Sequence, residues 1–277
     1  MSALLACSNI IIGLLVNSTS VVATGFEFAG DVLASSIIVI GMGVAARPAD
    51  ANHPYGHGRF ETLSAFVVGV ILAAAGVMIC YQSLQAVGAT HPPPGISAVA
   101  ALVAAIVLRG IMSSVKFRVG RRLRSSALVA DAWNDAVDIL SALAALVAVA
   151  LATYDPARFL AADHYGGFVV GIVVVVTGLR VLRDSSLELA DTMPAPDMTG
   201  DIVKISRSVA GVRGIDKVFA RKTGLQYHID LHIEVDPTLT IGASHAIGGR
   251  VRATLKRELP WVADVLVHVE PSRDAGE

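Results

Sequence analysis

The chain has 277 residues, of which 54% are apolar and only 16% are charged, and its mean hydropathy is +0.63. A water-solvated surface does not tolerate so apolar a composition, so we expect a membrane protein. The formal net charge of −1 gives no support for nucleic-acid binding. The two cysteines, Cys7 and Cys80, lie far apart in apolar runs and imply neither a disulfide framework nor a zinc knuckle.

Six apolar segments predict membrane helices within residues 1–190. Five are long enough to cross a hydrocarbon core of about 30 Å, at 26–46, 62–88, 96–117, 127–152 and 166–184. The sixth, from Ala3 to about Val16, is near or below the usual spanning length of about 17–25 residues. It has neither a basic leader nor an A-x-A-like cleavage site, so we interpret it as a helix rather than a removed signal. We expect an all-α six-helix transmembrane domain over residues 1–190.

Basic residues are concentrated in alternate connecting loops. Two arginines lie in the loop at 47–61 and four in the loop at 118–126, whereas the loops at 17–20 and 89–95 contain none and the loop at 153–165 contains one. Because Lys and Arg near helix ends are retained on the cytoplasmic side, both termini are expected to be cytoplasmic. The predicted location is a multi-pass position in the lipid bilayer of the bacterial inner membrane.

The last part of the chain has the alternation of charged and apolar residues that is typical of soluble domains. Two prolines in Met193-Pro194-Ala195-Pro196 predict a linker at 191–196. In the domain at 197–277 we expect a helix capped by Asp197 and ending near Ala210, strands at 216–221 and 227–235, a helix at 240–259 and a strand at 262–269. The order α-β-β-α-β predicts a two-layer, metallochaperone-like α+β sandwich.

Carboxylates inside the predicted membrane helices are the strongest functional signal. Glu27 and Asp31 are four residues apart, as are Asn134 and Asp138, so each pair lies on one helical face. A charge at the helix centre costs about 2.5–3.5 kcal/mol or more unless it faces a polar cavity or a partner. If the second and fifth helices touch, these four side chains offer enough oxygen ligands for one divalent cation.

Three further charges lie near this predicted site. Asp131 and Asp135 are on the same stripe and are candidate accessory ligands, although Asp131 is equally well explained as a solvated first-turn residue. Arg109, midway along the fourth segment, either snorkels towards the cytoplasm or pairs with a carboxylate, and the sequence leaves both open.

The ligand types limit the ion and suggest the mechanism. Oxygen ligands without histidine favour Mn²⁺ or Fe²⁺, whereas Zn²⁺ prefers nitrogen and sulfur but accepts carboxylate. An arriving metal ion would displace protons from crowded carboxylates, so metal–proton exchange is the expected mechanism.

Two further groups of metal-ligating residues lie outside the membrane segments. Asp50, His53 and His57 fall within eight residues of one loop and can reach one ion, although loop histidines are often only solvated. In the soluble domain, potential ligands are expected to converge at one edge of the sandwich, the alternative being scattered surface histidines. These candidates are His232, His245, His268 and Glu270.

The chain resembles the cation diffusion facilitators, also called cation efflux proteins, over nearly its whole length. The most specific feature is the loop Pro48-Ala49-Asp50-x-x-His53-Pro-Tyr-Gly56-His57-Gly58-Arg59-x-Glu61, and the six spans, the paired spacing and the C-terminal domain agree with it. Members of this family export divalent metal from the cytosol in exchange for protons, act as dimers and bind extra metal between their cytoplasmic domains.

The resemblance assigns roles by position. It implies a transport site at Glu27, Asp31, Asn134 and Asp138, a loop site at Asp50, His53 and His57, and a cytoplasmic dimerisation and metal-binding domain with a site at His232, His245, His268 and Glu270. Zinc-transporting members usually have histidine or aspartate where this chain has Glu27 and Asn134. The ion therefore stays open among Zn²⁺, Fe²⁺, Mn²⁺ and similar ions.

Two functions are compatible with these features: a divalent metal efflux transporter acting as a homodimeric metal/proton antiporter, or a non-transporting membrane metal sensor or regulatory partner subunit. A sensor needs no membrane carboxylates, so Asp31 and Asp138 favour the transporter. The sequence contains no H-E-x-x-H motif of an intramembrane metalloprotease, and we expect neither an enzyme nor an organic cofactor.

Overall fold

The computed structural model describes residues 2–88, 92–123 and 126–272, with the backbone alone described at 120, 123 and 126–131. The chain forms two compact units. One comprises residues 1–37 and 67–182, and the other comprises residues 38–66 and 183–277.

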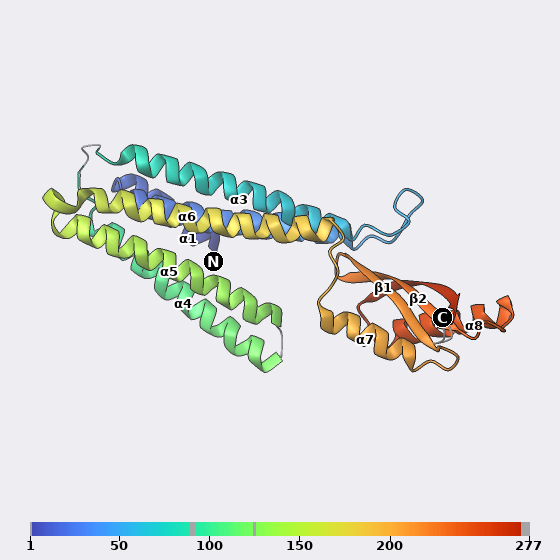
Figure 1. Cartoon of the computed structure of the whole chain (residues 1–277). Coiled ribbons are helices and arrows are strands. Elements are labelled where there is room, and N and C mark those ends of the chain that lie inside the picture. The colour runs from blue at the N-terminus through green and yellow to red at the C-terminus, as the bar shows by residue number, and fades with distance from the viewer. Residues whose placement is uncertain (1, 89–91, 124–125, 273–277) are drawn as a thin grey trace. The chain divides into compact units, whose positions relative to one another are not determined.

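Six helices form the N-terminal part of the chain (Figure 1). They are α1 (Ser2–Leu15), α2 (Thr19–Ala45), α3 (Arg59–Ala86), α4 (Ile96–Leu123), α5 (Ser126–Tyr154) and α6 (Pro156–Leu189). Helices α2 to α6 are long and apolar enough to cross a membrane, whereas α1 is a shorter apolar helix of 14 residues. The predicted helical membrane region with a short first helix is confirmed.

The predicted loop at 153–165 is wrong, because α6 begins at Pro156 and continues through a kink at Phe159. Proline suits the first turn of a helix, where its missing N–H leaves no bond unmade. Asp163 is fully buried in this first part of α6 and accepts hydrogen bonds from the backbone N–H groups of Thr19, at 2.6 Å, and Ser20, at 3.2 Å. It therefore caps α2, which explains why that helix begins seven residues before the expected 26.

Glycines bring α3 and α6 into close contact within the first unit. A Cβ atom at Gly76 would lie 2.6 Å from the backbone nitrogen of Val175, and one at Gly178 would lie 2.5 Å from the backbone nitrogen of Ala73. In lipid, helices associate mainly by such close backbone packing, because the hydrocarbon around them is as apolar as their side chains. These glycines therefore hold the two helices together.

Replacing Gly76 with alanine is expected to destabilise the folded protein by about 1–3 kcal/mol, because the added methyl group meets the α6 backbone. The loss should appear in spite of alanine's higher helix propensity, worth about 0.8–1.0 kcal/mol. Unfolding in mixed micelles of increasing SDS content measures it. The matched control is Gly110→Ala, where no atom lies within 4 Å of the new Cβ. Equal stability of the two variants would contradict the glycine contact.

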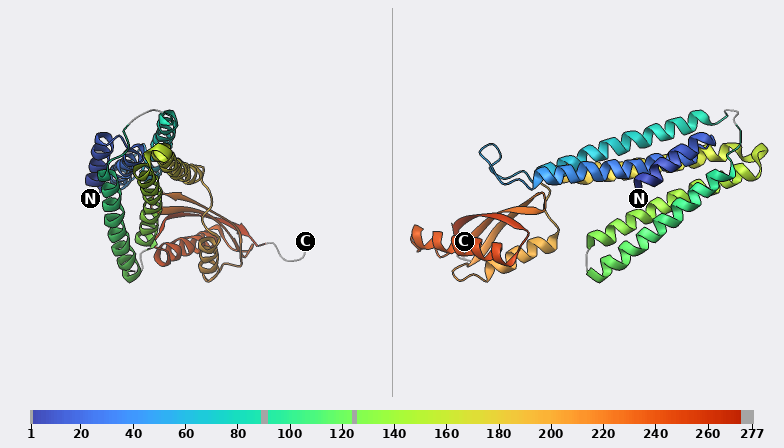
Figure 2. Two further views of the ribbon diagram at one scale, coloured as in Figure 1. Left: turned by 90° about the vertical axis from the view of Figure 1, so that its left-hand side faces the viewer. Right: turned by 180° about the vertical axis from the view of Figure 1, so that it is seen from behind.

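The C-terminal part forms a two-layer α+β sandwich, as predicted. Its elements are α7 (Pro196–Arg207), β1 (Gly214–Thr223), β2 (Gln226–Val235), α8 (Ile241–Glu258) and β3 (Val262–Pro271). The sheet order is β1-β2-β3, with β2 antiparallel to β1 and parallel to β3. Figure 2 shows α7 and α8 on the same face of this sheet. Alternate β2 residues, from Ile229 to Val235, are buried against them, so the other β2 side chains lie on the opposite face.

The start of α7 differs from the prediction. The residue at its N-cap is Ala195, whose side chain makes no capping hydrogen bond, and Pro196 occupies the first turn. Asp197 therefore lies inside the helix, where its carboxylate still interacts favourably with the N-terminal end of the helix dipole. The helix ends at Arg207, three residues before the expected Ala210.

Residues 197–277 are expected to fold alone and to dimerise. Among the described residues, the buried apolar core of this domain runs from Ile202 to Val265, with Val267 and Val269 packed against it, so the core is built from the domain's own residues. The isolated fragment should melt cooperatively by circular dichroism and sediment as a dimer. An unfolded spectrum, or a monomer both with and without added metal, would refute this expectation.

Candidate functional site: three groups of metal-ligating residues

A buried arginine links carboxylates of α2 and α5. Arg109 of α4 donates from Nη2 to Asp31 on α2, and from Nη1 to Asp138 on α5. Its Nη1 also lies 3.4 Å from Oδ1 of Asp135. The arginine is 4% exposed, and its guanidinium carbon lies 4.2 Å from the centre of the Phe28 ring. Of the two alternatives for Arg109, the structure has the one in which it pairs with carboxylates.

Two more polar side chains complete this membrane cluster. Ser141 lies one turn after Asp138 and donates from Oγ to the carboxylate of Glu27, at 2.8 Å from each oxygen. Lys116 lies two turns after Arg109 on α4, and its Nζ is 2.7 Å from Oδ2 of Asp135. Glu27, Asp31, Asp135 and Asp138, with Arg109, Lys116 and Ser141, are called the membrane cluster below.

The structure brings together three of the four predicted transport ligands. Glu27 and Asp138 are buried, and Asp31 is half-buried beside them. Asn134 is exposed on α5, one turn from Asp138, while Asp135 points into the cluster instead. The side chain of Asp131 lies outside the described residues.

The loop between α2 and α3 gathers Asp50, His53 and His57. The Nδ1 atom of His53 lies 3.1 Å from Asp50 Oδ1, and Nε2 of His57 lies 3.4 Å from Asp50 Oδ2. One ligand atom from each residue lies within 4.8 Å of the others, which suits a shared cation. The backbone N–H of His53 holds the pKa of Asp50 below its usual range, so this carboxylate is ionised and available as a ligand at neutral pH.

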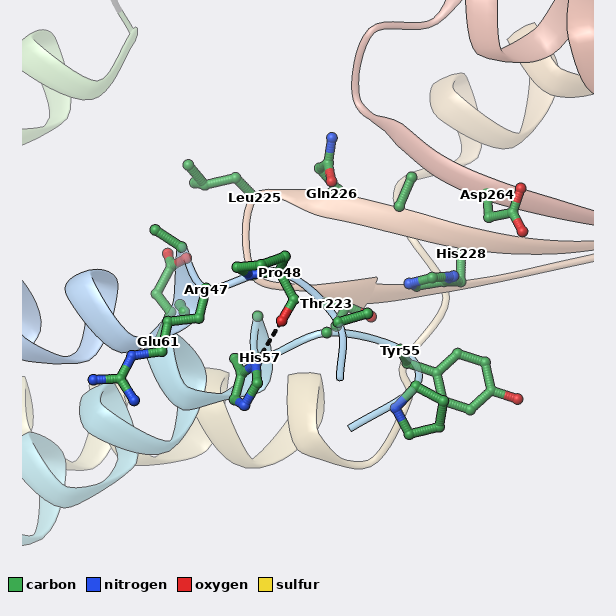
Figure 3. A pocket seen from close by; sticks show the side chains of 18 of the residues that line it. Arg47, Pro48, Tyr55, His57, Glu61, Thr223, Leu225, Gln226, His228 and Asp264 are labelled. Atoms are coloured by element: carbon green, nitrogen blue, oxygen red, sulfur yellow. Dashed lines mark hydrogen bonds between the residues drawn. The ribbon is translucent and has the colours of Figure 1, made fainter. Parts of the chain in front are cut away.

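The orientation of His57 is fixed by the loop itself. Its Nδ1 faces the carbonyl oxygen of Pro48 at 3.1 Å, as Figure 3 shows. A carbonyl only accepts hydrogen bonds, so Nδ1 carries the hydrogen and Nε2 presents its lone pair towards Asp50. A backbone partner of this kind is the usual second-shell support of a metal-binding histidine.

The same loop lines a cavity of about 760 Å³ together with the β1–β2 turn and the start of β3. Gly58 approaches this turn so closely that a Cβ atom would lie 2.5 Å from the carbonyl oxygen of Thr223. Tyr55 packs edge-on against His228, with ring centres 5.6 Å apart (Figure 3). Burial and the nearby cation of Arg221 lower the pKa of His228, which is therefore neutral at pH 7.

The third group lies on the sheet of the C-terminal domain. His232 on β2 is paired in register with His268 on β3, and the two rings are 4.9 Å apart. Oε1 of Glu270 lies 2.7 Å from Nδ1 of His232 and 3.6 Å from Nε2 of His268. One ligand atom from each of these three residues lies within 4.8 Å of the others, whereas His245 is exposed on α8 and is not part of the group.

Replacing both His232 and His268 with alanine is expected to lower the zinc stoichiometry of the C-terminal domain, because it removes two of the three grouped ligands. Calorimetric titration of the full-length protein measures the stoichiometry. His245→Ala is the matched control, which removes an imidazole from the same domain but outside the group, and should leave the stoichiometry unchanged. An unchanged value in the double variant would remove this site.

Two family models together match nearly the whole chain. The model described as the cation efflux transmembrane domain matches residues 1–190, and the model described as the cytoplasmic domain of cation efflux proteins matches residues 194–272. The chain belongs to the cation efflux family. This family consists of membrane transporters of metal ions, not enzymes.

Similar proteins include bacterial and plant members of this cation efflux family. An uncharacterised transporter, YdbO of Bacillus subtilis, is 32% identical and covers 97% of this chain and 91% of its own. The manganese efflux system protein MneP of the same organism is 29% identical, and the match covers 97% of this chain and 92% of MneP. Metal tolerance protein C1 of Arabidopsis thaliana is also 29% identical, but the match spans only 60% of that protein. A cadmium form of a MamM CTD variant is 27% identical, covers 28% of this chain and 98% of its own, and has a TM-score of 0.28.

Sequence reasoning missed two members of the membrane cluster. Lys116 lies seven residues after Arg109, a spacing that places both cations on one face of α4. Ser141 follows Asp138 by three residues, which continues the polar stripe of α5. Asp135 was assigned only an accessory role. The spacings were visible in the sequence, but which neighbouring helix each side chain meets was not.

Proposed function

We propose that the chain exports a divalent metal cation from the cytosol in exchange for protons, as a homodimer in the bacterial inner membrane with both termini in the cytoplasm. In this proposal residues 1–190 are the transport domain, residues 191–196 are the linker and residues 197–277 are the cytoplasmic dimerisation and metal-binding domain. The observation that carries it is the membrane cluster, in which carboxylates from α2 and α5 meet inside helices long enough to span a bilayer.

The transport site of this proposal comprises Glu27, Asp31, Asn134 and Asp138. Carboxylate and amide oxygens suit hard or borderline ions, so Mn²⁺ and Fe²⁺ are better candidates than Zn²⁺. The similarity to MneP, a manganese efflux system protein, supports the same choice. Asn134 is exposed on α5, so its participation requires α5 to turn or a solvent-filled approach to the site.

Proton exchange follows from the same ligands. A metal ion binds ionised carboxylates, and when it leaves, the vacated oxygens inside a low-dielectric membrane are better placed to take up protons than to remain unpaired. The loop group at Asp50, His53 and His57 and the domain group at His232, His268 and Glu270 lie outside this pathway. We assign them regulatory metal binding.

The competing function is a non-transporting metal sensor or a regulatory partner subunit. Such a protein would bind metal through its loop and C-terminal groups without moving any. Purified protein in proteoliposomes, tested with manganese, ferrous iron, zinc, cobalt and cadmium, separates the two functions, because only a transporter accumulates metal and dissipates a proton gradient.

Asp31→Ala and Asp138→Ala are each expected to abolish this metal flux, because each change removes a ligand and a proton acceptor. The protein should remain folded, since in each variant the buried Arg109 keeps two of its three carboxylate partners. Flux into proteoliposomes is the measurement, with monodisperse elution in detergent as the test of folding. Asp184→Ala is the control, since this carboxylate is exposed on α6 and pairs with the neighbouring Arg183 rather than with the membrane cluster. Metal–proton exchange at the unmutated rate in the first two variants would show that the ion does not pass between α2 and α5.

A further inference from the structure

Arg109 occupies the position that a transported ion would need. Its two Nη atoms bridge Asp31 on α2 and Asp138 on α5, which are two of the proposed ligands. One ion bound to both carboxylates would lie about 2.0–2.2 Å from an oxygen of each. A guanidinium group that hydrogen-bonds to both carboxylates uses oxygen lone pairs that such an ion would need, so the arginine and the ion compete for the same two oxygens.

The arginine is held by these carboxylates and by few other partners. It is almost fully buried, and among the described residues its Nε has no hydrogen-bond partner. A buried charge persists only where opposite charges compensate it, so the guanidinium cannot leave the cluster for the hydrocarbon. Asp135, whose Oδ1 already lies 3.4 Å from Nη1, gives it a place to move to inside the cluster.

From this geometry we propose that Arg109 is a tethered competitor of the transported cation. In the metal-free protein its guanidinium bridges Asp31 and Asp138, and it withdraws towards Asp135 when a divalent ion binds. The proposal rests on the transport function proposed above and adds a residue that sets the affinity of that site.

Two consequences follow for transport. Competition by an internal cation weakens metal binding, so the ion is released more readily on the far side of the membrane. The same cation compensates part of the negative charge of the empty site and proton uptake compensates the rest, which allows the metal-free protein to complete its cycle. An arginine suits this role because its charge is permanent and its planar fork contacts two carboxylates at once.

The test is Mn²⁺ flux into proteoliposomes containing full-length Arg109→Gln protein. The half-saturating Mn²⁺ concentration is expected to fall about tenfold, which corresponds to about 1.4 kcal/mol, and the maximal rate is expected to fall as well. A purely structural role predicts the reverse for affinity, since a damaged site binds metal more weakly. An unchanged or raised half-saturating concentration would therefore overturn the proposal.

The matched control is Arg121→Gln, the same substitution on the same helix. Arg121 is exposed and contacts the Phe117 ring rather than the cluster, so both kinetic constants should stay at the unmutated values. If Arg109→Gln protein does not fold, the comparison is made between Asp135→Asn and the double variant Arg109→Gln/Asp135→Asn. The double variant lacks one carboxylate and one cation, so its cluster keeps the net charge of the unmutated protein. Its half-saturating Mn²⁺ concentration is expected to be lower than that of Asp135→Asn by the same factor.

Failure of the two proposals can be distinguished. If the unmutated protein moves no metal, the transport function fails and this inference fails with it. The other case is that the unmutated protein transports Mn²⁺, but Arg109→Gln binds it no more tightly than the unmutated protein and the double variant no more tightly than Asp135→Asn. The transport function then stands, and the competitor role of Arg109 is wrong.

Discussion

The cost of placing charge in hydrocarbon governs the membrane part of this protein. Each carboxylate of the membrane cluster would be expensive if isolated at that depth, and the described contacts show how the chain compensates them. Asp31 and Asp138 share Arg109, and Glu27 accepts from Ser141. The compensation crosses from α2 through α4 to α5, so the charges that make the site useful also fix which helices must meet there.

The same constraint acts on backbone groups at the N-terminal end of α2. The first N–H groups of a helix have no partners within the helix, and in an apolar environment each unmade bond is costly. Asp163 accepts from two of them while remaining fully buried. A buried carboxylate near a membrane helix is thus not by itself a sign of metal binding. The aspartates of the membrane cluster differ from Asp163 because they pair with the side-chain cations Arg109 and Lys116, whereas Asp163 accepts hydrogen bonds from backbone N–H groups.

Sequence patterns predicted the elements well and their mutual orientation less well. Helices α2 to α6 were predictable because length and hydropathy fix a spanning helix, and the strands of the C-terminal domain because alternation fixes which side chains face the core. Asn134 and Asp135 could not be separated in this way. Both lie on one stripe of α5 with Asp138, and only the position of α4 decides that Asp135 faces inward. The cap of α2 by Asp163 was hidden for the same reason, since its partners are distant in sequence.

In the C-terminal domain, the layering of the fold explains which histidines can meet. His232 and His268 are on adjacent strands in register, and their side chains alternate with core residues, so they lie on the face of the sheet that the helices leave uncovered. His245 belongs to α8, a helix that covers the other face. Within one chain the sheet therefore separates His245 from His232, His268 and Glu270. A ligand role for His245 requires it to act with a second copy of the domain, which the proposed homodimer would provide.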